Sequence, residues 1–239
     1  MRSEYAKPSR RLWNLWLEWI QLHKILASGM KGELAAPFFS AANPRCKEGC
    51  IMVIGKATAG DYWLGDYKKS KSQEGAVEQR LKLNREVVAG GGNRSAFWTF
   101  FKGVEKLRPN PGLDGIIWSN VAKIGHVNRN SSGLLLSAQA DLAERTLRAE
   151  IEEYHPSLTF FVAGSDPCMS RIILHALNLG PGEADWFRSE KVEPKAKFPD
   201  VWWSKIGPAV LWTQHPERKS KEAVTYWLEK AKDLIGSAS

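Results

Sequence analysis

The chain has 239 residues, 43% hydrophobic and 25% charged, which excludes a disordered or low-complexity protein and fits one globular domain over residues 1–239. Its formal net charge of +8 favours an anionic partner such as nucleic acid, because clustered cations neutralise phosphates and release counterions. A basic surface that is merely solvated is the alternative. No stretch reaches the ~20 apolar residues of a membrane span, so we expect no membrane association.

Residues 1–45 form a predicted N-terminal helical segment. Apolar side chains recur at helical spacing, and the pattern ends at Gly29. Polar residues interrupt the run, so it is not a signal peptide. The stripe is more typical of core packing than of a ligand surface. Its members are Leu12, Trp16, Trp19 and His23.

The three cysteines, Cys46, Cys50 and Cys168, are an odd number without a secretory signal, which indicates a reducing compartment. We therefore expect a cytoplasmic protein. The spacing in "NPRCKEGC" does not match the common zinc sites, and a cluster held by cysteines alone needs four thiolates. The sequence thus predicts no metal and no cofactor.

Four short apolar runs have strand character: "CIMVIG", "GIIWSN", "LTFFVAG" and "PAVLWTQ". Each is nearly continuous, as in parallel strands covered on both faces. Helical patterns alternate with them, over 94–107 with Ser95 as N-cap, 137–156, 170–180, and 220–236 with Ser220 as cap. This alternation predicts an α/β fold, a three-layer α/β/α sandwich with a central four-stranded parallel sheet.

Two stretches are less regular. Residues 61–93 contain a basic run, a helix-like middle and three consecutive glycines, and we predict a mobile basic insertion near the site. Residues 181–207 are predicted to be an irregular connection before the last strand.

Polar residues gather where the four runs end, in "GKATAGDYW", "NVAKIGHVN", "GSDPCM" and "HPERK". Ligands of open parallel sheets bind outside the carboxyl ends of the strands. The functional site is therefore predicted at this edge.

The order of these segments over roughly residues 48–235 resembles the uracil-DNA glycosylase superfamily. There the first strand ends in a loop with a water-activating residue, a place that "VIGKATAGDYW" occupies. A later strand ends in a base-recognising Asn, as "IIWSNVAKIG" supplies Asn120, and "FFVAG" resembles the third strand. A His-Pro pair follows the last strand, as His215 and Pro216 do in "LWTQHPERKS".

The first loop departs from the family pattern, because it lacks the proline and has no Asp in the usual place after the glycine. Lys56, Ala57 and Thr58 stand there, and the nearest carboxylate is Asp61. The His-Pro loop continues with a cationic side chain where the family has an apolar wedge. These differences indicate a divergent branch.

The resemblance implies that His215 donates a hydrogen bond to the base oxygen where negative charge develops, and that Asn120 recognises the base edge. A packing His and a turn-forming Asn are the alternatives. Asp61 would orient water and stabilise the cationic sugar, or would simply follow glycine in a turn. The expected substrate-binding residues are Gly55, Lys56, Ala57, Thr58 and the stacking aromatics Tyr62 and Trp63.

Basic residues near the edge would follow a DNA backbone, with solvated charge as the alternative. They are Arg218, Lys219, Lys221, Lys68, Lys69 and Lys71, followed by Arg80, Lys82 and Arg85. The sequence thus predicts a monomeric glycosylase that flips uracil out of single- or double-stranded DNA. A nucleic-acid-binding relative without catalysis and an α/β enzyme for a small phosphorylated ligand remain alternatives.

Overall fold

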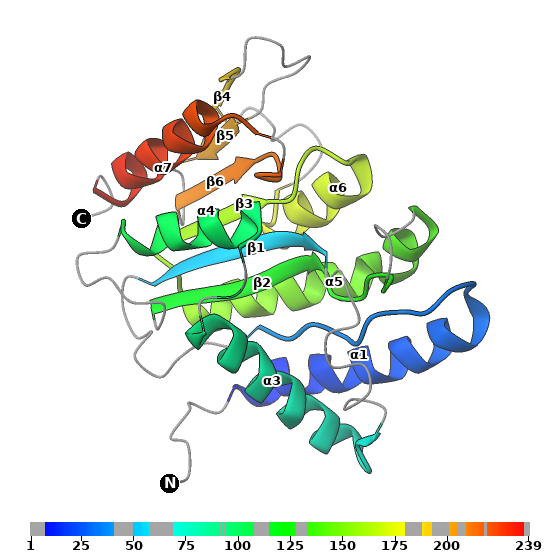
Figure 1. The fold of residues 1–239 in the computed structure, drawn as a ribbon. Coiled ribbons are helices and arrows are strands. Elements are labelled where there is room, and N and C mark those ends of the chain that lie inside the picture. The colour runs from blue at the N-terminus through cyan, green and yellow to red at the C-terminus, as the bar shows by residue number, and fades with distance from the viewer. Residues whose placement is uncertain are drawn as a thin grey trace, which may run out of the picture.

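A single mixed sheet forms the centre of the protein, as seen in a computed structural model (Figure 1). The structure describes residues 8–40, 50–57, 69–90, 92, 94–107, 115–127, 133–179, 188–192, 201–204, 209–217 and 219–236. Within these residues the sheet has six strands in the order β2-β1-β3-β6-β5-β4. In chain order they are β1 (Ile51–Ala57), β2 (Ile116–Ala122), β3 (Leu158–Val162), β4 (Arg188–Glu190), β5 (Val201–Ser204) and β6 (Ala209–Thr213).

The four strands expected from the apolar runs are present, and β2, β1, β3 and β6 are parallel neighbours. The predicted central four-stranded parallel sheet is matched only in part, because two further strands extend it. Within 181–207, expected to be irregular, β5 pairs antiparallel with β6, and β4 pairs antiparallel with β5. These strands are only four and three residues long, so they have little periodic signal. They cover the edge of β6, so that the sheet ends in a short, exposed strand.

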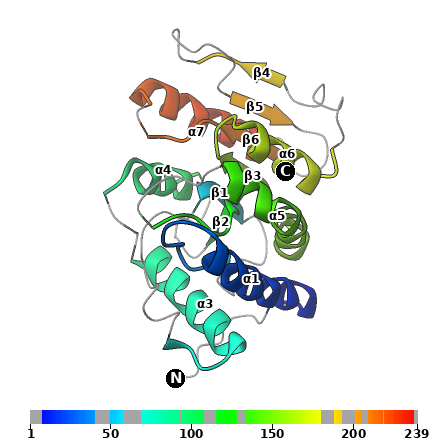
Figure 2. The same ribbon diagram turned by 90° about the vertical axis from the view of Figure 1, so that its right-hand side faces the viewer.

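Helices cover both faces of the sheet (Figure 2). One apolar core lies beneath α1 (Arg10–Gly29), α3 (Gln73–Ala89), α5 (Gly133–Tyr154) and α6 (Pro167–Ala176). The other lies beneath α4 (Ala96–Glu105) and α7 (Lys221–Gly236). Both cores form because strand side chains alternate between the faces, so that Met52 packs into the first and Val53 into the second.

The helix predictions are largely confirmed. The side chain of Ser95 accepts from the Trp98 N–H, and that of Ser220 accepts from the Ala223 N–H. The first helix ends at Gly29, and its predicted stripe is buried, as expected for core packing. Its Trp19 indole donates to Thr146 Oγ1 of α5 at 2.8 Å, which joins α1 to α5.

Two helices start earlier than predicted. Helix α5 begins at Gly133 and α6 at Pro167. The second difference has a clear cause: the Asp166 carboxylate accepts from the N–H groups of Cys168 and Met169, and Pro167 suits a first helical position. In "GSDPCM", Asp166 is therefore a helix cap.

The helix expected inside residues 61–93 is α3, capped by Ser72. Ala76, Val77 and Leu81 belong to the first core, so this part of the predicted insertion is packed against the domain. The mobility predicted for the segment stays a prediction.

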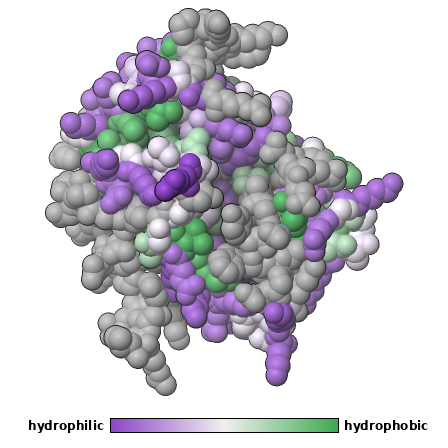
Figure 3. Space-filling model, in the orientation of Figure 1, coloured by the Kyte–Doolittle hydropathy of each residue, from purple (hydrophilic) through white to green (hydrophobic). Residues whose placement is uncertain are grey.

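Among the described residues on the face seen in Figure 1, the surface is mainly hydrophilic, with smaller apolar areas between polar side chains (Figure 3). Ile25 and Leu134 are the exposed large hydrophobic residues within the described part of the chain. No helix in the described ranges is both long and apolar enough to cross a bilayer.

The capping role of Asp166 can be tested by changing it to Ala. Loss of an N-cap carboxylate should lower the free energy of unfolding by about 1 kcal/mol, measured by urea denaturation. Asp141→Ala, at an exposed ion pair with Arg145, is the matched control and should change it by less than about 0.5 kcal/mol. Equal effects would contradict the capping role.

Candidate functional site

The carboxyl ends of β1 and β2 meet in a register that pairs Gly55 with Asn120. A Cβ at position 55 would lie 2.5 Å from Asn120 Oδ1 and 3.4 Å from Phe97 Cε2. Only a glycine leaves room for the Asn120 amide and the Phe97 ring at this point of the sheet. Gly55, which was predicted to bind substrate, thus leaves space for these two side chains.

A cavity of about 830 Å³ opens at this edge. Of the predicted residues, Gly55, Lys56, Ala57, Asn120 and His215 all line it. They come from β1, from β2 and from the segment that follows β6, which are far apart in the sequence, and the sheet brings them together. The predicted convergence of the strand ends on one site is therefore present for these five residues.

The first turn of α4 supplies an aromatic wall that sequence reasoning missed. Phe97 and Trp98 line the cavity together with Trp118 of β2. The ring centroids of Trp98 and Trp118 are 4.9 Å apart, and those of Phe97 and Trp118 are 5.9 Å apart. A signal was available: a helix that crosses between parallel strands starts at their carboxyl edge, so aromatics in its first turn lie beside the site.

His215 lies opposite this wall, with its ring nearly parallel to that of Phe97, at 15° and a centroid distance of 6.2 Å. The Glu217 backbone N–H donates to His215 Nδ1 at 3.2 Å. An Nδ1 that accepts a hydrogen bond carries no proton, so the neutral ring has its proton on Nε2. Partial burial lowers the pKa of His215, a nearby Glu217 opposes this, and Lys56 lowers the pKa further. The imidazole is therefore a neutral donor at pH 7.

The end of α3 forms the remaining wall. It contributes Asn84, Glu86 and Val87, and none of these was predicted. The Asn84 side-chain amide donates to the Phe39 carbonyl, which anchors this wall to the domain. The cavity thus combines the polar side chains of Asn120 and His215 with an aromatic wall. No group of three or more His, Cys, Asp or Glu residues suited to a metal ion occurs in the described part of the chain.

Several predicted residues lie outside the described residues: Thr58, Asp61, Tyr62, Trp63, Lys68, Arg218 and Cys46. Among the predicted cations, Lys219 precedes α7, Lys221 is its first residue, and Lys69 is exposed before α3. Arg80 is a correction: it is 2% exposed, and its Nε donates to the Pro37 carbonyl at 3.0 Å. A buried guanidinium cannot follow a DNA backbone. Cys50 is buried, and its Sγ lies 3.6 Å from the Tyr154 carbonyl oxygen.

A scan against protein-family models finds no matching family, and a search of curated proteins finds no significant match. The function is consequently inferred from the residues of the cavity and from their geometry.

The protonation state of His215 can be measured by ¹⁵N–¹H NMR of its ring. We expect the Nε2–H tautomer at pH 7 and a pKa below 6.5, because burial disfavours the imidazolium. Since the unfolded chain then binds the proton more readily, His215 should reduce stability as the pH falls below 6.5 through its folded pKa. An Nδ1–H tautomer or a pKa above 6.5 would contradict this arrangement.

Proposed function

We propose that this protein is a DNA glycosylase that flips uracil out of DNA and hydrolyses its N-glycosidic bond, leaving an abasic site. The observation that carries the proposal is the convergence of Asn120 and the neutral His215 on one aromatic-walled cavity. The fold supports it, because parallel strands covered by helices on both faces bring these two segments to the same edge. On this proposal the domain is uracil-DNA glycosylase-like.

Base recognition would fall to Asn120 and Phe97. A side-chain amide offers one donor and one acceptor, which match the O4 and N3–H of uracil and oppose the corresponding edge of cytosine. Phe97 would provide a stacking surface, and base–aromatic stacking contributes about 1–3 kcal/mol per base in single-strand complexes. Tyr62 and Trp63 remain further candidates for stacking.

His215 would stabilise the leaving group. When the C1′–N1 bond breaks, its electron pair stays on the base, and negative charge develops on the uracil oxygens. A neutral imidazole that donates from Nε2 to O2 stabilises this charge without having to release its own proton. Lys56, close enough to influence His215, would add positive potential on the same side.

The sugar carries the opposite charge, and a water molecule must add to C1′. By resemblance this task belongs to Asp61, whose carboxylate would stabilise the cationic sugar and orient the water. The proton of the attacking water would pass to that carboxylate, which completes hydrolysis without a metal or cofactor.

A nucleic-acid-binding protein without catalysis is the second candidate. It is favoured by the residues that follow Gly55, since Lys56 and Ala57 line the cavity where the family pattern has a water-activating residue. This candidate keeps base and DNA binding but predicts no excision.

A labelled uracil-containing oligonucleotide, treated with alkali to reveal abasic sites, tests the proposal directly. We expect excision by the wild-type chain, and a loss on the order of a hundred- to a thousand-fold in single-turnover rate for His215→Ala, as for removal of one charge-stabilising donor. Asn120→Ala should weaken discrimination between uracil and cytosine.

The matched control is His175→Ala. His175 lies on α6 and contacts Glu144 of α5, so the same chemical change is made outside the cavity. The control should excise at the wild-type rate. DNA binding without excision by the wild-type chain would select the second candidate.

The basic residues that follow His215 have a separate test. Arg218→Ala combined with Lys219→Ala should weaken DNA binding and reduce the slope of log K against log salt by about 1 to 2, because each phosphate contact releases about one counterion. Lys24→Ala with Lys31→Ala removes the same charge from exposed positions at the end of α1 and just after it. A slope that responds equally in both double variants would exclude a specific role for the 218–219 pair.

A further inference from the structure

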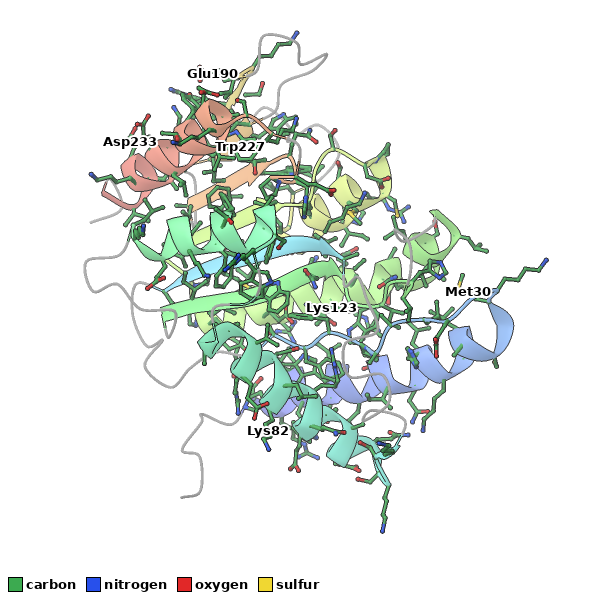
Figure 4. All side chains as sticks on the ribbon, viewed as in Figure 1. Met30, Lys82, Lys123, Glu190, Trp227 and Asp233 are labelled. Carbon is green, nitrogen blue, oxygen red and sulfur yellow. The ribbon has the colours of Figure 1, made fainter. Side chains whose placement is uncertain are left out.

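A fully buried ion pair lies behind the site, on the opposite face of β2. Lys123 Nζ lies 2.8 Å from both carboxylate oxygens of Glu150 on α5, and both side chains are 0% exposed. Ser119 of β2 completes the cluster, since its hydroxyl donates to Glu150 Oε2 at 2.7 Å and accepts from Lys123. Figure 4 shows Lys123 near the end of β2.

A fully buried ion pair of this kind is unusual in a protein core. Burial lowers the pKa of Lys123, while the charge and hydrogen bonds of Glu150 oppose this effect. Removing two charges from water offsets most of their attraction, so apolar residues of similar volume are often equally stable there. The cluster therefore needs an explanation other than stability, and a role in fixing one arrangement of the chain is the best-attested one.

The sequence of β2 shows that its register relative to the neighbouring elements has to be fixed by something other than apolar packing. Five of its seven residues, "IIWSNVA", are apolar, and both faces of the strand are covered. Apolar contacts alone hardly distinguish one register from the next in such a strand. A shift by one residue would place Ser119 or Val121, instead of Asn120, beside Gly55.

The cluster does distinguish these registers, because Ser119 and Lys123 both contact the same carboxylate. Ser119 directly precedes Asn120, so its side chain points to the opposite face of the strand. Any shift of β2 along α5 would leave Glu150 buried without these partners. Nearby, the Gln139 side chain of α5 bonds both the N–H and the carbonyl of Ile124, which ties the following residues to the same helix.

We propose that Ser119, Lys123 and Glu150 are positioning residues that hold β2 on α5 in the one register that presents Asn120 to the cavity. The pair acts through the strand and does not touch substrate. The proposal deepens the function proposed above, because Asn120 is the residue assigned there to base recognition.

The test combines two variants with a conservative rescue. Lys123→Met with Glu150→Leu replaces the pair by apolar side chains, Ser119→Ala removes the hydroxyl contact of β2, and Ser119→Thr keeps a hydroxyl. The readouts are the melting temperature, the NMR signals of the Asn120 side-chain amide, assigned by their loss in Asn120→Asp, and the ratio of uracil to cytosine excision.

We expect the Asn120 signals to shift or broaden in the double variant and, to a smaller extent, in Ser119→Ala, and to return in Ser119→Thr. The excision ratio should fall on the order of tenfold in the double variant, as expected when a recognition group is misplaced. Thr146→Val is the matched control, since it removes a buried hydrogen bond of α5 to α1 instead of β2. It should lower the melting temperature and leave the Asn120 signals unchanged.

Unchanged Asn120 signals in both the double variant and Ser119→Ala would overturn the proposal, whatever happens to the melting temperature. If the double variant does not fold, Ser119→Ala and Ser119→Thr decide. A wild-type chain that excises no uracil would refute the proposed function, but the NMR comparison would still judge the positioning role. Excision with wild-type discrimination and unchanged signals in the variants would refute the positioning role alone.

Discussion

The parallel pairing of β1 with β2 is the constraint on which the candidate site depends. It places Gly55 beside Asn120, where the absent Cβ leaves space for the amide and for Phe97. The helix before β2 starts at the same edge because a crossover helix runs back against the strands, and its first turn therefore brings the aromatic wall. One register thus supplies the space, the polar group and the stacking surface together.

The two faces of β2 have different tasks. The face toward α4 presents Asn120 and Trp118 to the cavity, whereas the face toward α5 carries Ser119 into a buried charged cluster. At the other side of the cavity, a main-chain N–H sets the tautomer of His215. In both places groups that contact no ligand would determine how a functional side chain is presented, as preorganised polar sites require.

Much of the fold followed from local pattern. Continuous apolar runs identified the four parallel strands, and the caps Ser95 and Ser220 located two helix starts. The pattern failed where pairing partners matter more than composition: β4 and β5 are too short to show a period and exist through pairing at the edge of β6. The prediction that Arg80 contacts DNA was wrong for a related reason. A cation in a basic stretch is expected to be solvated, and only the packing of its helix against residue 37 shows that it is buried.

The amino-acid pattern alone was sufficient to predict the α/β class and to place polar residues, Asn120 and His215 among them, at the strand ends. These features depend on short-range order along the chain. The aromatic wall, the proton on Nε2 of His215 and the charged cluster beneath β2 became apparent only in the folded chain. The aromatic wall and the charged cluster join segments distant in sequence, and such contacts are set by how helices and strands pack, which no local window of residues contains. The proton position of His215 follows from a contact only two residues along the chain, but that contact depends on the backbone conformation of the folded loop.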